Sequence, residues 1–299
     1  MNPILTAVVE VDGTPTATSA WDVVPWWSFG KTLLAAAALR LAETGRLDLD
    51  ARLPKRPYTL RQLLRHRAGL PDYGALPAYG EAIARGDAPW TDAELFARVD
   101  AERLRFKPGA GWAYSNVGYL VVRRHLEQVC DAGLADLLRD LVLGPLGLGR
   151  SRLATTVDDL RATAFAGAWG YDPGWAFHGV VIGPVAEAAL ALHRILEDGV
   201  LSPASRAAML RWHPIGGALS GRPWITAGYG LGLMIGTMQG PHARRFLAGH
   251  GAAGPGSVGA IYRALGPEPG RVVAAFAAEA DEATVEHAAL RAILSPSGI

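Results

Sequence analysis

Trp27-Ser28-Phe29-Gly30-Lys31 opens the stretch that decides the fold of this chain, and Thr32-Leu33-Leu34-Ala35-Ala36-Ala37-Ala38-Leu39 continues it. Leucine and alanine are strong helix formers, and residues 31–44 contain neither Gly nor Pro. Gly45 is expected to end the helix, because glycine readily adopts the left-handed conformation that follows a last turn. Arg40 and Glu43 are the only charged residues beyond the first turn, so the sequence predicts a helix that is buried around most of its circumference.

The head of this helix carries a serine and a lysine that can work together. Ser28 and Lys31 are three residues apart, so both side chains project from one face of the helix. Burial and the positive end of the helix dipole both disfavour the ammonium form of Lys31 and lower its pKa. A neutral amine beside a hydroxyl can act as its general base, which predicts a nucleophilic Ser28. The alternative is a helix-capping serine beside a lysine that extends to water.

The rest of the chain predicts strands near its ends and helices between them. Residues 4–11 are partly alternating and β-branched, which is typical of a strand, and a short extended piece ends near Pro25. Helices are expected at residues 59–66, 91–99, 117–129, 134–141 and 184–198, with an aromatic, glycine-rich loop at 165–178. Strands are expected at residues 229–238, 244–250, 257–265 and 271–278, and Asp281 begins a final helix that ends at Leu294.

This order predicts an α+β fold with an antiparallel sheet that is built from both chain ends and flanked by helices. The sheet-plus-helix domain is expected to take residues 1–58 and 216–299. A mainly helical domain of residues 59–215 is expected to be inserted into it.

Composition excludes several classes of protein. Half of the 299 residues are apolar, enough for a large core. The chain has 29 Lys and Arg residues and 28 Asp and Glu residues. This balance argues against a nucleic-acid partner, because a protein that binds nucleic acid needs an excess of basic residues to neutralise the phosphates. The single cysteine, Cys130, excludes an intramolecular disulfide and a thiolate zinc site. The eight histidines are scattered, so we expect no metal and no cofactor.

The first twelve residues have no positively charged N-terminal region, no continuous apolar run and no cleavage site of small residues. We therefore expect that the chain has no signal peptide. No apolar run reaches the length of about 18 residues that a membrane-spanning helix needs. We therefore expect a cytoplasmic protein without a membrane partner. The oligomeric state stays open.

Two further stretches carry candidate chemistry. In Tyr114-Ser115-Asn116 the phenol is suited to carry a proton between serine and leaving group, and the amide to bind substrate. The alternative is a surface tyrosine followed by an asparagine that caps a helix. His250-Gly251-Ala252-Ala253-Gly254-Pro255-Gly256 closes an expected strand, where small residues leave room for a ligand. An amide there can form an oxyanion hole with the amide of Ser28, and the alternative is a glycine-rich hairpin turn.

With these motifs in this order, the chain resembles the serine β-lactamase-related hydrolases. That group includes class C β-lactamases, serine D-alanyl-D-alanine carboxypeptidases and family VIII carboxylesterases. The family's Ser-x-x-Lys, Tyr-x-Asn and Lys/His-x-Gly motifs match here as Ser28…Lys31, Tyr114…Asn116 and His250-Gly251-Ala252. Residues 58–71, 107–109, 144–148 and 228–232 are also similar, so the resemblance covers about residues 20 to 280. It implies a β-lactamase/transpeptidase-like fold.

The resemblance also implies roles for these residues. Ser28 attacks an ester or amide carbonyl, Lys31 removes its proton, and Tyr114 relays a proton to the leaving group. Asn116 orients the acyl side chain, and the amides of Ser28 and Ala253 hold the oxyanion. The aromatic loop is expected either to form the wall of the acyl pocket or to pack as a lid over the helical domain, through Trp169, Tyr171, Trp175 and Phe177. The rim of the pocket is expected to include Tyr73 and Trp112.

Three departures from the family pattern bear on the substrate. Only 27 residues precede Ser28, which implies that the family's usual N-terminal helix is missing. Ala252 replaces a glycine, and its methyl group is expected to narrow the site or tilt the strand. His250 stands where class C β-lactamases have lysine and peptidase-type members have histidine, which points away from a dedicated β-lactamase.

The sequence therefore predicts a cytoplasmic esterase or amidase that acts through a Ser28 acyl-enzyme on a small ester, amide or β-lactam. The alternatives are a β-lactamase or a D-amino-acid peptidase, and a catalytically silent binding protein of the same fold.

Overall fold

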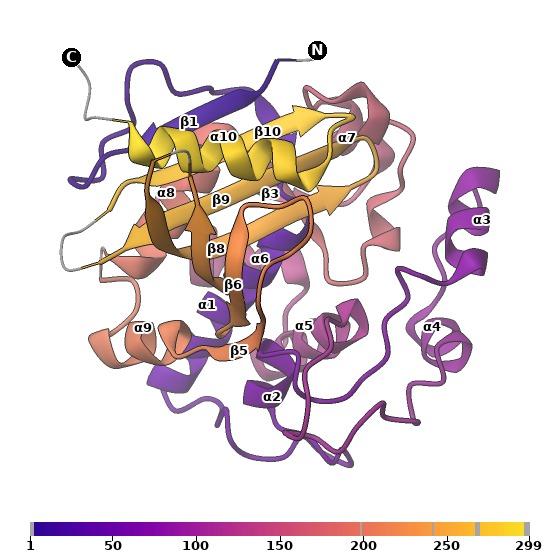
Figure 1. Cartoon of the computed structure of the whole chain (residues 1–299). Coiled ribbons are helices and arrows are strands. Elements are labelled where there is room, and N and C mark those ends of the chain that lie inside the picture. Colours follow the sequence, from indigo (N-terminus) through magenta and orange to yellow (C-terminus); the bar gives the residue numbers. More distant parts are fainter. Residues whose placement is uncertain (1–2, 198, 241, 267–269, 296–299) are drawn as a thin grey trace.

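Seven antiparallel strands form the main sheet in the order β1-β10-β9-β8-β7-β6-β5 in the computed structural model, which describes residues 3–197, 199–240, 242–266 and 270–295. The N-terminal strand β1 (Leu5–Val9) pairs with the last strand β10 (Val272–Ala278), which confirms that both chain ends build the sheet (Figure 1). The other strands are β5 (His213–Gly216), β6 (Trp224–Tyr229), β7 (Met234–Gln239), β8 (Arg244–Gly254) and β9 (Ser257–Leu265).

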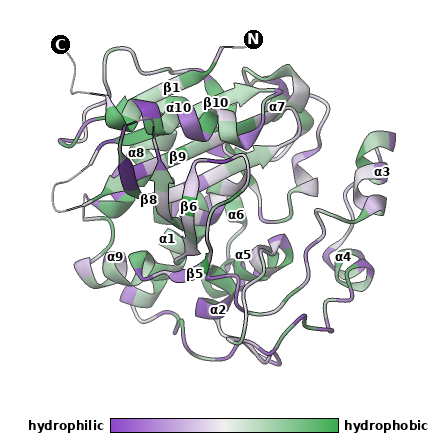
Figure 2. Cartoon of the chain, viewed as in Figure 1, coloured by the Kyte–Doolittle hydropathy of each residue, from purple (hydrophilic) through white to green (hydrophobic). Residues whose placement is uncertain are grey.

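Helices cover both faces of this sheet. The predicted final helix is α10 (Glu282–Leu294), and it packs on β9 and β10. Apolar and hydrophilic residues alternate along α10 in Figure 2, as expected of a helix with one buried face. The helix α8 (Val185–Leu196) also contacts β10 and β9, together with β1. Residue 198, where α8 was expected to end, lies outside the described residues.

The helix α1 (Gly30–Glu43) confirms the prediction made from its leucines and alanines. Its residues from Gly30 to Leu39 are all buried, and it contacts helices of the neighbouring region. The short 3₁₀ helix η1 (Trp27–Phe29) precedes it and lies against β8. The nucleophile candidate therefore lies where a largely buried helix meets the main sheet.

The middle of the chain is mainly helical but includes strands that its sequence pattern did not indicate. A second sheet has the order β2-β4-β3, from β2 (Val23–Pro25), β4 (Val180–Pro184) and β3 (Arg152–Ala154). Every residue of β4 is buried, and such a short apolar run has no alternation to mark it as a strand. The helices are α2 (Leu60–Leu64), α3 (Pro77–Arg85), α4 (Asp92–Arg98), α5 (Asn116–Cys130), α6 (Leu134–Leu138) continued by η2 (Arg139–Leu143), α7 (Val157–Arg161), η3 (Ala166–Ala168), η4 (Pro173–Trp175) and α9 (Pro203–Leu210).

Two sequence predictions about strands were wrong. Residues 229–238 form no single strand, because β6 ends at Tyr229 and β7 begins at Met234. Gly232 between them has a φ of +67°, and a Cβ there would lie 2.6 Å from the Cβ of Ala35, so the chain turns tightly against α1. The strand β8 does not end at His250 but pairs with β9 as far as Gly254. Residues 250–254 of the glycine-rich stretch are thus strand, and only Pro255 and Gly256 form the hairpin turn to β9.

The helix α8 belongs to residues 59–215 yet packs on the main sheet. The division of the chain at residues 58/59 and 215/216 stays a prediction.

Candidate active site

Ser28 lies in a turn whose backbone is held in an unusual conformation. The preceding residue, Trp27, has a φ of +37°, which is rare for a bulky side chain. Its indole packs edge-on against Tyr171 at 5.6 Å, and its Nε1 donates a 2.9 Å hydrogen bond to the hydroxyl of Ser257. These contacts fix the place from which the Ser28 hydroxyl projects.

Lys31 is the candidate general base, and its side chain is completely buried. Its Nζ lies 3.1 Å from the Oγ of Ser28. Burial lowers the pKa of Lys31 to about 7, and the negative charge of Asp72 opposes part of this lowering. At neutral pH a large fraction of the amine is therefore unprotonated and able to accept a proton.

Tyr114 completes a line of polar groups through Ser28. Its hydroxyl donates a 3.0 Å hydrogen bond to Ser28 Oγ. Burial raises the pKa of Tyr114, so the phenol keeps its proton at neutral pH. The ring lies 4.4 Å from that of His66, and the Nδ1 of His66 accepts the backbone N–H of Ser115. The expected meeting of Ser28, Lys31 and Tyr114 is thus present in the fold.

Asn116 is the first residue of α5, whose N-cap is Ser115. Its backbone N–H donates a 2.7 Å hydrogen bond to one carboxylate oxygen of Asp72, and its side-chain amide lies 3.4 Å from the other. Asp72 therefore orients the amide, which lines the cavity beside Ser28. Asp72 was not predicted as a site residue, and it directly follows the family-like stretch 58–71.

The strand β8 brings the third motif to the same place. Pairing between β7 and β8 ends at Met234 and Gly249, and no described strand continues it along residues 250–254. This free edge can bind an extended substrate through backbone groups. Ala253 lies at the cavity, whereas the Ala252 side chain is fully buried in the core and is not part of the cavity wall. The methyl group of Ala252 thus does not narrow the opening.

His250 is a neutral residue in this structure. Its Nδ1 lies 2.6 Å from the carbonyl oxygen of Gly251, which only accepts, so Nδ1 carries the hydrogen. Its Nε2 then accepts from the hydroxyl of Tyr229 at 2.8 Å. Burial, with the charge of Lys31, lowers the pKa of His250 to about 3. His250 supplies no positive charge for a substrate carboxylate.

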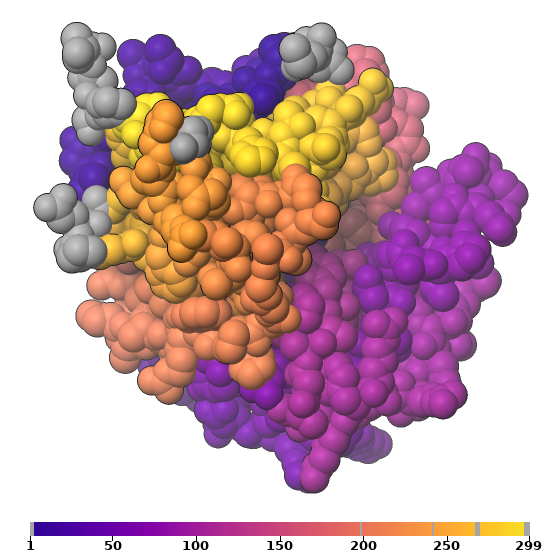
Figure 3. All heavy atoms as spheres, viewed as in Figure 1, coloured from indigo at the N-terminus to yellow at the C-terminus, as the bar shows by residue number. Residues whose placement is uncertain are grey.

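A cavity of about 220 Å³ opens beside Ser28. Its walls come from distant parts of the chain: Trp27, Tyr73, Gly74, Tyr79, Ile83, Asn116, Tyr171, Ala176, His178, Ala253, Gly254 and Pro255. Figure 3 shows recessed atoms between the yellow and orange C-terminal part and the purple region that contains α3 and α4. Among the described residues that form the walls, none is Asp, Glu, Lys or Arg. The cavity is suited to a neutral, partly apolar group.

The aromatic residues expected at this wall divide into two groups. Tyr171 and Tyr73 line the cavity. Trp175 and Phe177 are buried in the aromatic cluster behind it, and the Nε1 of Trp175 donates to the carbonyl of Asp87. Trp169 is 43% exposed and lies apart from the cavity wall. Trp112 also lies apart from it, 6.0 Å from the ring of His66.

His178 is a neighbour of the site to which sequence reasoning gave no role. Its Nε2 lies 3.2 Å from Lys31 Nζ, and the two residues are 147 positions apart. Within the ranges that the structure describes, no group of three His, Cys, Asp or Glu side chains is arranged to hold a metal ion. The arrangement can activate a serine hydroxyl, because a neutral amine lies on one side of Ser28 and a proton-bearing phenol on the other.

Comparison with known proteins places this chain in a family of serine hydrolases. A model of the family described as Beta-lactamase matches residues 8–295. The chain therefore belongs to the Beta-lactamase family, which confirms the resemblance drawn from its motifs.

Named relatives share part of their length with this chain. Penicillin-binding protein 4* of Bacillus subtilis is 31% identical over 137 residues, which are 42% of this chain and 29% of that protein. A D-aminopeptidase of Cereibacter sphaeroides is 33% identical over 104 residues, which are 32% of this chain and 19% of the relative. The matches thus span less than a third of each curated relative.

Solved structures show the fold over nearly the whole chain. A D-stereospecific amidohydrolase from Streptomyces sp. superposes with a TM-score of 0.77 at 22% identity, covering 99% of this chain and 94% of the other. This likeness confirms the predicted α+β fold class. None of the helices described here has the length and apolar character needed to span a membrane.

Proposed function

We propose that this protein hydrolyses amide bonds of small substrates that carry no carboxylate, through an acyl-enzyme on Ser28, and that it also turns over activated esters. The observation that carries the proposal is the position of Ser28 Oγ, 3.1 Å from Lys31 Nζ and 3.0 Å from the Tyr114 hydroxyl. Such a serine has a base within reach and a proton donor for the leaving group.

The reaction follows from these contacts. Ser28 Oγ bonds to the substrate carbonyl carbon while its proton moves to the Lys31 amine. The backbone amides of Ser28 and Ala253 stabilise the oxyanion. The carbon–nitrogen bond then breaks as the leaving amine receives a proton through Tyr114, leaving the acyl group on Ser28. Water gives a proton to the same amine and attacks the acyl carbon. The bond from this carbon to Ser28 Oγ then breaks, Oγ takes the proton back from Lys31, and the acid is released.

The substrate class is supported by the charges around the cavity. A β-lactam antibiotic of the penicillin type carries a carboxylate, and a cation usually binds such a group. His250 stays neutral above a pH of about 3. The described cavity wall also offers neither Lys nor Arg. We therefore favour a substrate without a carboxylate, such as an amino acid amide, over a penicillin.

The relatives add a preference for the substrate's configuration. Proteins similar to this chain are named D-aminopeptidase and D-stereospecific amidohydrolase. We therefore propose an amidase or aminopeptidase that prefers a D-configured acyl residue.

The test combines intact mass with turnover. The protein is incubated separately with a short-chain p-nitrophenyl ester, with D- and L-phenylalanine amide, and with a penicillin. We expect an adduct on Ser28, turnover of the ester and of the D-amide, and little turnover of the penicillin. Ser28→Ala is expected to abolish both adduct and turnover. Absence of both adduct and turnover in the wild-type protein would refute this function in favour of a silent binding protein.

A further inference from the structure

The Lys31 amine has a second polar neighbour in His178. The imidazole Nε2 lies 3.2 Å from Lys31 Nζ, nearly the same distance as the 3.1 Å between Lys31 Nζ and Ser28 Oγ. His178 is buried, lines the cavity and belongs to the segment between η4 and β4, outside the three motifs. Its position is therefore set by the fold and not by the helix that carries Lys31.

The valence of a neutral amine gives this contact a direction. A neutral lysine has one lone pair and two N–H bonds. The lone pair must face the Ser28 hydroxyl if Lys31 is to take its proton, so the N–H bonds need acceptors elsewhere. The Nε2 of His178 provides an acceptor only when the imidazole hydrogen is on Nδ1, and Nδ1 is buried without a hydrogen-bond partner among the described residues. The contact with Lys31 therefore has to offset the cost of that unpaired N–H group. The other tautomer would donate into the lone pair and compete with Ser28.

The charges around the pair keep His178 neutral. Burial and the charge of Lys31 hold the pKa of His178 well below its usual value, and His250 and Arg123 act in the same direction, against a backbone interaction with Trp27. Asp72 is the acidic neighbour that raises the pKa of Lys31. The other titratable groups that face the amine are Tyr114, Tyr119, His66 and His250.

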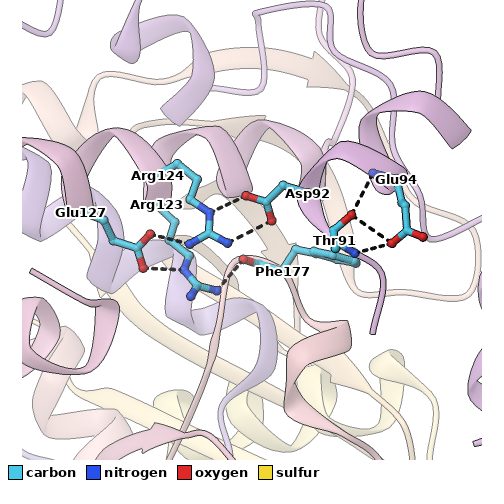
Figure 4. A network of polar contacts seen from close by, with 7 residues as sticks. All are labelled: Thr91, Asp92, Glu94, Arg123, Arg124, Glu127 and Phe177. Atoms are coloured by element: carbon cyan, nitrogen blue, oxygen red, sulfur yellow. Dashed lines mark hydrogen bonds and ion pairs between the residues drawn. The ribbon is translucent and has the colours of Figure 1, made fainter. Parts of the chain in front are cut away.

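The backbone on both sides of His178 is firmly held. Arg123 of α5 donates a 3.0 Å hydrogen bond to the carbonyl of Phe177, and Glu127 fixes the same guanidinium (Figure 4). On the other side, Gly179 has a φ of +90° and packs so closely that a Cβ would lie 2.5 Å from the side chain of Leu134. These contacts allow the imidazole little freedom relative to Lys31.

We propose that His178 is a positioning residue whose Nε2 accepts an N–H hydrogen of Lys31 and turns the amine lone pair toward Ser28. This inference rests on the proposed acyl-enzyme function. When the Ser28 proton moves to Lys31, the resulting ammonium keeps its hydrogen bond to Nε2. His178 is not protonated at any step, and the proton continues from Lys31 to the leaving amine.

The chain offers an unusually clean way to observe Lys31. It contains only three lysines, Lys31, Lys55 and Lys107, so protein labelled with ¹³Cε-lysine gives three signals that can be titrated by NMR. We expect a Lys31 pKa of about 7 in the wild type. His178→Leu removes the acceptor and destabilises the ammonium, so the pKa should fall by about one unit. His178→Gln retains an acceptor oxygen and should stay near the wild-type value.

The rate at which a fluorophosphonate labels Ser28 measures how reactive the serine is in each variant. We expect His178→Leu to react about 10- to 100-fold more slowly and His178→Gln within about threefold of wild type. His193→Leu replaces another buried histidine, on α8 and outside the site, and controls for a general loss of packing. In wild-type protein with ¹⁵N-labelled histidine, we expect the hydrogen of His178 on Nδ1.

The outcomes separate the two proposals. Wild-type protein that is never labelled at Ser28 would refute the acyl-enzyme function itself. A labelled wild type with the His178 hydrogen on Nε2 would overturn the positioning role alone. An unchanged Lys31 pKa in His178→Leu would do the same. The tautomer measurement needs no variant, so it decides the matter even where His178→Leu fails to fold.

Discussion

The indole nitrogen of Trp27 donates a 2.9 Å hydrogen bond to the hydroxyl of Ser257, 230 positions later in the chain. This bond joins the turn before Ser28 to the hairpin between β8 and β9. A positive φ at a bulky residue costs energy and persists only where the surroundings hold it. Here Gly254 lies against the face of the Trp27 ring, so the end of β8 and the nucleophile are fixed relative to each other.

A methyl group at Gly254 should disturb both stability and chemistry. A Cβ there would lie 2.3 Å from the Trp27 ring, so the indole or the strand must move. We expect Gly254→Ala to lower the free energy of unfolding by about 1–3 kcal/mol, as overpacking does, and to slow acylation of Ser28. Urea denaturation and fluorophosphonate labelling measure the two effects. Gly149→Ala is the control, because no atom would lie within 4 Å of its Cβ. Wild-type behaviour of Gly254→Ala would show that the packing of Gly254 on Trp27 does not position Ser28.

Lys31→Met should separate stability from activity. A buried amine lowers stability because the unfolded chain can hydrate its charge, whereas methionine fills a similar volume without charge. We expect the free energy of unfolding to stay equal or rise by up to about 3 kcal/mol, while the general base is lost and kcat/KM falls about 100- to 10,000-fold. Thermal unfolding and ester turnover test this. A marked loss of stability would show that Lys31 holds the fold together.

The pH dependence of kcat/KM should report Lys31. Below its pKa of about 7 the amine is protonated and cannot accept the Ser28 proton, so activity should rise with pH through about 7 and then level off. His250 has a pKa of about 3 and stays neutral across this range. A p-nitrophenyl ester assayed between pH 5 and 9 gives the profile. Activity that is flat down to pH 5 would exclude Lys31 as the base.

Tyr114→Phe should affect turnover more than folding. The variant loses the hydroxyl that donates to Ser28 but keeps the ring that packs on His66. We expect kcat to fall about 100-fold or more, in line with the loss of an acid–base group, with little change in Tm. The fall in kcat should be larger for amide substrates than for p-nitrophenyl esters, because an amine leaves only after it gains a proton. Equal losses on both substrates would argue against the proton-donor role.

The buried carboxylate of Glu286 should be the most sensitive point for stability outside the site. It accepts hydrogen bonds from the guanidinium of Arg222 and from Trp224 Nε1, and is almost fully buried. Arg222→Leu leaves this charge without its partner, so we expect a loss of about 3–5 kcal/mol in unfolding free energy. Replacement of the exposed Arg161, which pairs with Asp158 at the surface, should change it by less than about 1 kcal/mol. Similar small effects of both would contradict the burial argument.

Features that depend on short stretches of chain could be predicted from the sequence. The buried helix α1 follows from its run of leucine and alanine, and the spacing of Ser28 and Lys31 puts both on one face. The strands β9 and β10 and the capped helix α10 were predicted closely, because each has a consistent apolar pattern between clear turn residues. The order of three motifs was enough to indicate the family.

Other features depend on contacts between distant residues. The turn between β6 and β7 lies in Gly230-Leu231-Gly232-Leu233, where alternating glycine and leucine resemble a strand pattern. The extension of β8 to Gly254 lies in a run of glycine and alanine, whose small side chains leave no pattern of apolar and polar positions. The strand β4 is buried throughout, so it shows no alternation either.

What the sequence by itself determined is the presence of a serine–lysine pair on a buried helix and the family that such a pair, with Tyr114 and His250, indicates. Only the tertiary structure decided the surroundings of that pair. It placed His178 beside Lys31 and Asp72 beside Asn116, and it tied His250 to Tyr229. The physical reason is that local sequence patterns record the periodicity of the backbone and the burial of each face. The pKa of a lysine and the charge of a cavity depend instead on which distant side chains the completed packing brings within a few ångströms.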